Sequence, residues 1–445
     1  MKHKLFIPDN VGVIIEKLNS SGFEAFIVGG CVRDSILGII PYDWDITTNA
    51  FPEDIKKIFE KTFDTGIKHG TVSVFINDEF CEVTTYRIDG EYSDNRRPDS
   101  VQFTSSLKDD LARRDFTINA IAYHPKEGLI DYFEGLKDLD NCQIRAVGDA
   151  NLRFKEDALR MLRAIRFSAQ LGFSIDAATF DAIKRNSLLI ENISNERIRD
   201  ELNKILVSPN PMHFDLLYKT GLLEHIIPEF IACYSTKQNN PYHMYSVSEH
   251  ILRSVDYVKN TNILRWTMLL HDIGKPIQKT TDEKGIDHFY GHQQVGADLA
   301  RNILNRLRFD KESIKKITNL VLHHDSDIFD NEKSIKKVIN KVGEDSFLEL
   351  IEVQKADAMS QNSVYLEERL VKFKNILKIY NKIKAESHCL SKKDLAVNGY
   401  DLISIGMNPG KELNNMLNYL LECVLENPEL NDRQILIDLA KNNIS

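Results

Sequence analysis

The sequence has 445 residues, of which 42% are hydrophobic and 28% charged, and its formal net charge is −9. This length favours two to four domains, and the composition is ordinary for a soluble globular protein. No apolar stretch reaches the roughly 18 residues of a membrane span, and the basic start lacks the apolar core of a signal peptide, so neither is expected. The acidic total argues mildly against nucleic-acid binding, although such binding needs only a local basic face.

Two runs of basic residues offer such a face. Either run could bind RNA, but a charged run on a helix is usually a solvated surface, so both interpretations stay open. The first run comprises Arg153, Lys155, Arg160, Arg163 and Arg166, and the second comprises Lys184, Arg185, Arg197, Arg199 and Lys204.

The six cysteines are scattered along the chain without a close pair. That spacing indicates reduced thiols rather than a disulfide framework or a zinc finger, and it predicts a cytoplasmic protein. The six are Cys31, Cys81, Cys142, Cys233, Cys389 and Cys423.

Hydrophobic periodicity divides the chain into a mixed head and a helical remainder. Short β-like runs alternate with helices over residues 1–145, whereas apolar residues recur at helical spacing from Phe154 onward. The polar stretch 234–241 predicts a linker. The predicted domains are a head at 1–145, a helical neck at 146–233, a histidine-rich helical domain at 242–370 and a helical tail at 371–445. Helices are predicted over 156–171, 177–186, 195–207 and 212–220.

The head contains two aspartates one residue apart, Asp43 and Asp45, shortly after Gly29 and Gly30. Residues i and i+2 of a β-strand face the same side, so both carboxylates could bind one pair of Mg²⁺ ions, the usual arrangement for in-line attack on a phosphate. The glycines would let backbone N–H groups approach an anionic triphosphate. An isolated Asp-x-Asp is common, and a metal site is indicated here by the order helix, strand, Gly-Gly, short helix and second strand.

This order of parts resembles the class II nucleotidyltransferases of the DNA polymerase β type, the branch that holds bacterial tRNA nucleotidyltransferases and poly(A) polymerases. The run Arg113-Arg114-Asp115-Phe116-Thr117-Ile118-Asn119-Ala120 is similar to the motif with which these enzymes bind the triphosphate and ribose of the incoming nucleotide. By chemistry alone, paired arginines only suggest a phosphate clamp. The resemblance implies a third metal-binding carboxylate at Glu82, which is predicted to open a strand. It further implies nucleotide contacts from Gly29, Gly30, Arg33, Arg113, Arg114, Asp115 and Asn119.

A predicted amphipathic helix over 154–166 carries Asp157, Arg160 and Arg163. Arg160 follows Asp157 by three residues and Glu156 by four, so it can share a face with either, and one interpretation is a surface ion pair worth about 0–1 kcal/mol. The alternative comes from the family, because Glu-Asp-x-x-Arg resembles its motif that reads the Watson–Crick edge of C or A. That resemblance assigns base selection to Asp157 and Arg160 and nucleotide binding to Arg163. The segment 195–202 is similar to a helix that braces the base-reading helix, and we interpret it as structural.

The region 242–370 contains a series of metal-ligand side chains that is hard to explain as isolated core histidines. Its His271-Asp272 pair is followed by Gly274 and Pro276, which predict the end of a helix. The series resembles the HD superfamily of metal-dependent phosphohydrolases, and the extra histidines match its binuclear members. The resemblance implies a divalent transition metal such as Mn²⁺, Ni²⁺ or Fe, and a repair role in trimming damaged or cyclic-phosphate RNA ends. The candidate ligands are His250, His271, Asp272, His292, His323, His324 and Asp357.

Together the motifs predict a multidomain α+β enzyme, with a polymerase-β-type nucleotidyltransferase head followed by an all-helical body that contains an HD domain. It would use CTP, ATP and Mg²⁺ to add the terminal CCA to tRNA without a nucleic-acid template, with no membrane partner and with its oligomeric state left open. The polar loop 87–98 resembles the flexible loop that is needed for adding the final A. The segment 397–411 resembles a tail that binds the tRNA elbow.

Other activities share some of these motifs. An A-adding enzyme that follows a separate CC-adding partner has the same motifs and loop, so that alternative stays open. A CC-only enzyme is disfavoured by the loop, and a poly(A) polymerase is disfavoured because 65–72 follows the CCA-type pattern. The intact Asp43, Asp45 and Arg113-Arg114-Asp115 argue against a signalling phosphohydrolase with a degenerate head and against an inert RNA-binding module.

Overall fold

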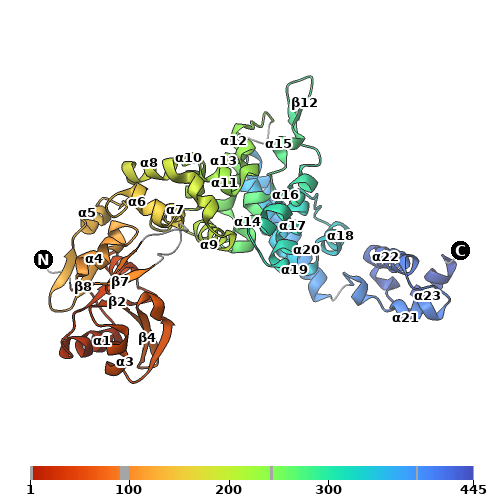
Figure 1. The fold of residues 1–445 in the computed structure, drawn as a ribbon. Coiled ribbons are helices and arrows are strands. Elements are labelled where there is room, and N and C mark those ends of the chain that lie inside the picture. The colour runs from red at the N-terminus through yellow and green to blue at the C-terminus, as the bar shows by residue number, and fades with distance from the viewer. Residues whose placement is uncertain (1–3, 91–99, 241–243, 387–388, 444–445) are drawn as a thin grey trace. The chain divides into compact units, whose positions relative to one another are not determined.

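The protein, described here from a computed structural model, divides into two compact units, Met1–Pro228 and Glu229–Ser445. Strands are concentrated in the first unit and the second is almost entirely helical (Figure 1). This arrangement confirms the predicted mixed head followed by a largely helical body. The structure describes residues 4–90, 100–240, 244–386 and 389–443.

The head is built on a seven-stranded sheet with the order β3-β4-β5-β2-β1-β8-β9. β-Branched and aromatic residues dominate its strands, as the run Thr71–Ile76 of β4 shows. Helices α1 and α3 pack on the sheet and on each other (Figure 1). Phe26 and Val28 pack with Leu107 and Leu111 of α4 in a separate cluster. The strands are β1 (Ala25–Val28), β2 (Asp45–Thr48), β3 (Thr62–Gly66), β4 (Thr71–Ile76), β5 (Glu79–Thr85), β8 (Ile121–His124) and β9 (Gly128–Asp131).

The backbone register aligns one residue from each of three neighbouring strands. Val28 of β1 pairs with Asp45 of β2 in antiparallel fashion, and Asp45 pairs with Glu82 of β5 in parallel fashion. Directly paired residues project from the same face of a sheet. The side chains of Asp45 and Glu82 therefore share the face on which α4 packs, while Ile46 and Val83 are buried on the opposite face.

The positions of Asp43 and Glu82 along their strands differ from the prediction. β2 begins at Asp45, so Asp43 precedes the strand. The reason is that β1 ends at Val28, since Gly29 adopts a φ of 83° and turns the chain into α2 (Gly30–Ile36), so on the β1 side β2 has no partner beyond Asp45. Glu82 lies in the middle of β5 rather than at its start, because pairing with β4 extends the strand back to Glu79.

The helix predicted over 154–166 is in fact two helices. α6 ends at Glu156 and α7 begins at Leu159, because Asp157 adopts an extended backbone with φ −133° and ψ 103°. The Asp157 carboxylate instead accepts the N–H of Leu159 at 3.1 Å, a contact typical of helix starts. The helices of the first unit are α1 (Asp9–Ser20), α2 (Gly30–Ile36), α3 (Pro52–Ile58), α4 (Leu107–Ala112), α5 (Gly135–Asp140), α6 (Ala150–Glu156), α7 (Leu159–Leu171), α8 (Ala177–Asn186), α9 (Asn195–Leu206), α10 (Asp215–Lys219) and α11 (Leu222–Ile226).

Two small strand pairs complete the first unit. β6 (Arg87–Asp89) pairs with β7 (Val101–Phe103), so the start of the predicted loop 87–98 is a strand, and 91–99 lie outside the described residues. β10 (Gln143–Ile144) pairs with β11 (Ser174–Ile175), which places a short strand after the head where only helices were predicted.

The second unit is helical around a core that includes the fully buried Trp266. One hairpin, β12 (Thr280–Thr281) with β13 (Asp287–His288), interrupts the predicted all-helical pattern. Pro276 does not simply end a helix but lies in the first turn of α15, where its missing N–H is harmless. The helices are α12 (Ile231–Ser235), α13 (Val247–Tyr257), α14 (Asn262–Leu270), α15 (Lys275–Gln278), α16 (His292–Arg306), α17 (Lys311–His323), α18 (Glu332–Val342), α19 (Glu344–Met359), α20 (Leu366–Ala385), α21 (Gly399–Ser404), α22 (Lys411–Glu426) and α23 (Arg433–Asn442).

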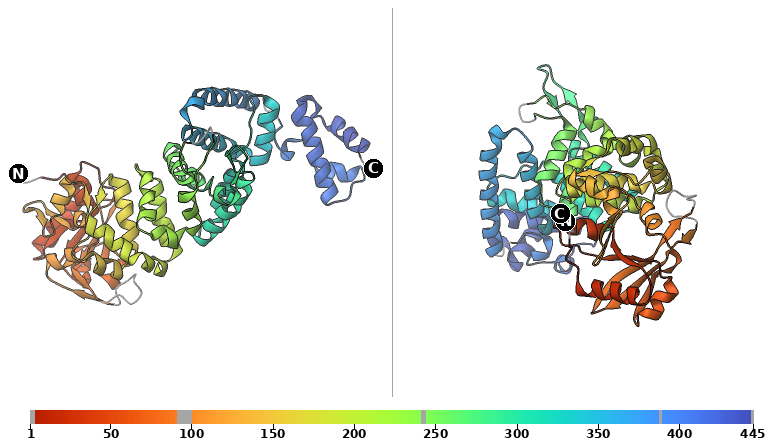
Figure 2. Two further views of the ribbon diagram at one scale, coloured as in Figure 1. Left: turned by 90° about the horizontal axis from the view of Figure 1, so that it is seen from above. Right: turned by 90° about the vertical axis from the view of Figure 1, so that its left-hand side faces the viewer.

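The last three helices pack against one another into a small bundle, the blue end of the chain in Figure 2. Its core includes Leu402, Leu420 and Leu436, each fully buried. Within the described ranges, no helix combines the length and the apolarity required to cross a membrane.

Candidate active sites

Three carboxylates face one another in the head, those of Asp43, Asp45 and Glu82. Burial raises the pKa of the Asp45 carboxyl and Asp43 raises it further, although Arg114 opposes the shift. Burial also raises the pKa of Glu82, and the negative charges of Asp45 and Asp43 add to that shift. A purely oxygen donor set with mutual repulsion suits a hard divalent cation such as Mg²⁺, whose binding would relieve the repulsion.

Arg114 lies against this carboxylate group because Gly29 has no side chain. A Cβ at Gly29 would stand 2.9 Å from Nη1 of Arg114 and 3.6 Å from Oδ2 of Asp45. The positive φ of Gly29 adds a second reason for glycine there. A guanidinium is therefore held beside the carboxylates, where it can meet the negative charge of a phosphate.

Asp110 of α4 anchors both arginines of the motif, a role that the sequence did not suggest. Its carboxylate is fully buried and accepts from Nε of Arg113 at 2.9 Å and from Oγ1 of Thr47 at 3.0 Å. Nη2 of Arg114 lies 3.8 Å from its second oxygen. The only sequence signal was position, since Asp110 precedes Arg113 and Arg114 by three and four residues, one helical turn.

The remaining motif residues form one hydrogen-bonded line between the head and α7. Nη1 of Arg33 donates to Oδ1 of Asn119 at 2.7 Å, and Nδ2 of Asn119 donates to Asp115 at 3.1 Å. Nε of Arg163 donates to Oδ2 of Asp115 at 2.7 Å. Although burial alone would raise the pKa of Asp115, Arg163 and Asn119 hold it well below its ordinary range. The predicted residues Arg33, Asp115, Asn119 and Arg163 thus lie together.

The predicted base-reading residues have separate partners. Asp157 receives Nη2 of Arg197 at 3.1 Å, from α9. Arg160 pairs with Glu156 and donates from Nη2 to the backbone oxygen of Arg113 at 3.0 Å. The ion pair predicted between Glu156 and Arg160 is present, whereas the break at Asp157 turns the carboxylate of that residue toward Arg197. The segment 195–202 was interpreted as structural, but its Arg197 contacts Asp157, one of the two predicted base-reading residues, directly.

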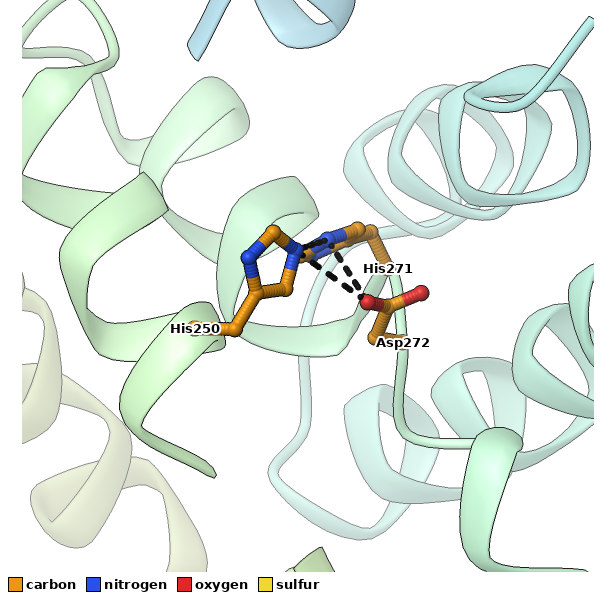
Figure 3. Close-up of side chains that lie close together, drawn as sticks. All are labelled: His250, His271 and Asp272. Atoms are coloured by element: carbon orange, nitrogen blue, oxygen red, sulfur yellow. Dashed lines mark hydrogen bonds and ion pairs between the residues drawn. The ribbon is translucent and has the colours of Figure 1, made fainter. Parts of the chain in front are cut away.

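In the second unit, one carboxylate lies between two pairs of histidines. Oδ2 of Asp272 is 3.3 Å from Nε2 of His250 and 3.2 Å from Nε2 of His271. Its other oxygen, Oδ1, is 3.3 Å from Nε2 of His292 and 3.5 Å from Nε2 of His324. Figure 3 shows the first pair, with both imidazoles directed at the carboxylate. The ligand atoms of each set of three lie within 4.8 Å of one another.

Asp357 of α19 adds a second carboxylate to the first histidine pair, at 2.9 Å from Nε2 of His250 and 3.7 Å from Nε2 of His271. The structure therefore brings six of the seven predicted ligands together, and we call these six the histidine cluster. Its members are His250, His271, Asp272, His292, His324 and Asp357.

The ring orientations fit a metal. The Nδ1 atoms of His271, His292 and His324 each lie 2.7 Å from a backbone carbonyl oxygen, so each Nδ1 carries the proton. Each Nε2 then points inward, and those of His292 and His324 lie only 3.3 Å apart. Burial opposes protonation of His271, but Asp272 and Asp357 raise its pKa to about 10, so a proton on its Nε2 meets the two carboxylates where a metal ion would take its place. Converging imidazole nitrogens and carboxylates form a donor set that fits a cation, and mixed nitrogen and oxygen donors suit a divalent transition metal.

His323, the seventh predicted ligand, does not share these contacts. It is the last residue of α17, and consecutive helical residues point about 100° apart, so only His324 turns toward Asp272. Lys275 was not predicted as a site residue. Its Nζ lies 2.6 Å from Oδ2 of Asp272 and donates to Oε1 of Gln238 at 2.9 Å, from the segment predicted to be a linker.

Three family models match separate stretches of the chain. A model for the poly A polymerase head domain matches residues 25–145, and one for an RNA- and SrmB-binding site of polymerase A matches residues 172–233. A model for tRNA nucleotidyltransferase domain 2 matches residues 278–440. The first match contains all three head carboxylates and the arginine motif.

The chain is 38% identical to a CCA-adding enzyme of Ligilactobacillus salivarius over 438 residues, which are 96% of this chain and 95% of that protein. It belongs to the CCA-adding enzyme family. A CCA-adding enzyme of Pediococcus pentosaceus is 35% identical, with 98% of each chain covered. The crystal structure of the Bacillus stearothermophilus CCA-adding enzyme in complex with CTP matches with a TM-score of 0.74 and 30% identity, again over 98% of each chain. The predicted class II membership is thus confirmed, and this nucleotidyltransferase family implies a divalent metal ion in the head.

The anchoring role of Asp110 can be tested by removing its carboxylate. We expect Asp110→Ala to lower the free energy of unfolding of the head by about 3–5 kcal/mol, because two arginines lose a buried partner. Asp109→Ala, one residue away, should cost less than about 1 kcal/mol. Urea unfolding followed by the fluorescence of Trp44, with Trp266→Phe in every protein compared, measures both, and equal losses in the two variants would contradict the anchoring role.

The position of His292 depends on close packing at Gly274. A Cβ there would meet the backbone oxygen of His292 at 2.3 Å and the nitrogen of Gly296 at 2.7 Å. We expect Gly274→Ala to displace the start of α16 and to weaken binding of Mn²⁺ by about 10- to 100-fold, as loss of ligand support does. Gly399→Ala, whose nearest neighbour would be at 3.4 Å, is the matched control. Titration calorimetry with Mn²⁺ that shows equal affinity in both variants would refute the prediction.

Proposed function

We propose that this protein adds the 3′ terminal CCA to tRNA, using CTP and ATP and no nucleic-acid template. The observation that carries the proposal is the in-register pairing of Asp45 with Glu82 beside Asp43, within a chain that matches CCA-adding enzymes over almost its whole length. The similar Bacillus stearothermophilus enzyme is described in complex with CTP, which supports CTP as a substrate here.

Asp43, Asp45 and Glu82 would hold Mg²⁺ in the head. When bound, Mg²⁺ would lower the pKa of the attacking 3′ hydroxyl and neutralise charge on the triphosphate. Arg114, fixed beside Asp45, would stabilise the negative charge that develops at the α-phosphate as pyrophosphate leaves. Arg113 shares the Asp110 carboxylate with Arg114 and would clamp the triphosphate from the same side.

The line of hydrogen bonds from Arg33 to Arg163 would place the ribose and the base. Asn119 can exchange its contact with Arg33 for a ribose hydroxyl, while Asp115 holds Arg163 in place. Asp157 and Arg160 would select the base, since a carboxylate and a guanidinium supply the acceptors and donors that the Watson–Crick edges of C and A require. Arg197 and Glu156 contact these two side chains and would compete with a nucleotide for them.

The histidine cluster supports a second activity, hydrolysis of phosphate esters by an HD-type site. The two oxygens of Asp272 face different histidine pairs, so the histidine cluster would hold divalent metal of the Mn²⁺, Ni²⁺ or Fe type. Bound metal would supply a deprotonated water near neutral pH. Lys275, held by Gln238, would neutralise the remaining charge of Asp272 and of the phosphate. A role in trimming RNA ends fits this chemistry.

Complete CCA addition is favoured over the A-adding alternative, because the relatives matched over nearly full length are CCA-adding enzymes. All six cysteines are free, which supports our inference of a reducing, cytoplasmic location.

The deciding experiment supplies the purified protein with tRNA transcripts that end before CCA, after C and after CC. CTP and ATP are given separately and together. We expect full CCA on the shortest transcript, because one protein would carry out all three additions. Extension of the CC-ended transcript alone, by a single A, would instead establish the A-adding enzyme.

Two independent sites predict separable losses of activity. We expect Asp43→Ala with Asp45→Ala to lower nucleotide addition by at least about a thousandfold, since a metal-binding carboxylate pair supplies several kcal/mol to the transition state. Hydrolysis of a cyclic nucleotide should persist in that variant, whereas Asp272→Ala should show the opposite pattern. Loss of both activities in either variant, with the fold intact by circular dichroism, would contradict the two-site assignment.

A further inference from the structure

The β12–β13 hairpin forms one wall of the cavity above the histidine cluster. The cavity has a volume of about 450 Å³ and is lined by Asp272, His292 and His324. Residues 286–291 also line it, and they comprise the end of the hairpin and the segment that follows. That segment leads directly into α16, whose first residue is His292. A group presented by this segment therefore lies close to any phosphate held at the cluster.

The base of the hairpin is firmly held. Asp287 is 6% exposed and accepts from Nζ of Lys279, the N–H of Asn239 and Oγ1 of Thr281, each at 2.8 Å. Three hydrogen bonds to one buried carboxylate fix the exit of β13. The side chains just beyond it are thus presented from a defined position and not from a loose loop.

Tyr290 is exposed but oriented. Its side chain is 77% exposed, yet its ring stacks on His288 with 5.3 Å between centroids and 8° between planes. The Tyr290 hydroxyl lies 3.3 Å from Nδ1 of His288, and Nε2 of His288 lies 3.1 Å from a carboxylate oxygen of Asp282. The imidazole lies parallel to the tyrosine ring and against its hydroxyl end, and the high exposure of Tyr290 leaves most of the ring in water. This is the geometry of an aromatic platform with a free face.

The charged side chains around the cavity restrict which ligands can bind beside Tyr290. Beyond the cluster, the lining includes one lysine, Lys275, and two further carboxylates, Asp287 and Asp325. The cluster can neutralise one phosphate, and Asp287 is already paired with Lys279, but Asp325 would repel a triphosphate or a longer run of backbone phosphates. The flat face and the single phosphate together describe a terminal nucleotide.

We propose that Tyr290 stacks on the base of the nucleotide whose phosphate lies at the histidine cluster, so that the site selects substrates that carry a base. The inference rests on the proposed phosphohydrolase function of the cluster and names a specificity residue for it. In the reaction, a water oxygen bonds to phosphorus, the ester P–O bond breaks, and the proton of the water passes to the released ribose oxygen. Tyr290 does not touch the reacting atoms and acts as a specificity residue.

The test compares two probes that differ only in the base, adenosine 2′,3′-cyclic phosphate and 1-O-methylribose 2,3-cyclic phosphate, with the full chain loaded with Mn²⁺. We expect Tyr290→Ala to lower the ratio of kcat/KM for the first probe to that for the second by about tenfold or more, mainly through KM, because one base–aromatic stack is lost. Tyr290→Phe should keep the ratio within about twofold of that of the unaltered protein, since the ring remains.

A second measurement does not depend on the loaded enzyme. Metal-free protein is irradiated with an RNA oligonucleotide that ends in 4-thiouridine, and the crosslinked peptide is identified by mass spectrometry. We expect the crosslink at Tyr290 and its loss in Tyr290→Ala. An unchanged kcat/KM ratio in Tyr290→Ala, or a crosslink at the same site in that variant, would contradict the proposed stacking of Tyr290 on the base. Failure of the unaltered protein to hydrolyse either probe would instead overturn the phosphohydrolase function.

Discussion

The nucleotidyl-transfer site depends on one backbone constraint, the parallel register that places Asp45 beside Glu82. A shift of one residue would turn Asp45 into the core and Ile46 toward solvent, because the side-chain period of a strand is two. Ile46 and Val83, paired with each other, are 1% and 0% exposed, so burial of these two residues resists such a shift. The hydrophobic face of the sheet thereby holds two repelling carboxylates together on the other face.

A local constraint plays the same part in the histidine cluster. In His271, His292 and His324, Nδ1 lies 2.7 Å from the carbonyl oxygen of the residue three positions earlier. Each of these histidines lies at a helix end, where backbone carbonyl groups are available to accept a side-chain hydrogen bond. In each of the three histidines, this short contact therefore fixes a proton on Nδ1 and directs Nε2 toward the cluster. Ligand orientation here follows from where helices begin and end.

Much of the fold and of both sites could be predicted from the sequence, because the relevant signals are local. The strand Ala25–Val28 and the helices over 177–186 and 195–206 follow from periodicity. Six of the seven predicted ligands in the second unit lie together, and so do Arg33, Asp115, Asn119 and Arg163 of the first unit. What failed depends on pairing or on long-range partners. Asp43 lies outside β2 because Gly29 ends the neighbouring strand, and the helix across Asp157 breaks where its carboxylate caps α7 and meets Arg197, forty residues away in sequence.

The site residues that sequence analysis did not identify have one property in common. They hold charged side chains in place but belong to no recognisable sequence motif. Asp110 and Gln238 are recognisable only once the side chains they hold, Arg113 and Lys275, are seen to depend on them. A buried carboxylate or amide looks the same in sequence whether it caps a helix or anchors a cation. Three-dimensional proximity is the only signal that separates the two cases.

The two proposed metal sites differ in their donor atoms, and this difference would let each select its own ion. The head presents carboxylates alone, and oxygen donors suit Mg²⁺. The cluster presents four imidazoles with two carboxylates, and nitrogen donors favour later transition metals, which also bind most N/O sites more tightly. On the proposed assignment, the head would bind Mg²⁺ through oxygen donors alone, and the cluster would hold a later transition metal by the higher affinity of its imidazoles. Imidazole in place of carboxylate would thus separate the two proposed chemistries.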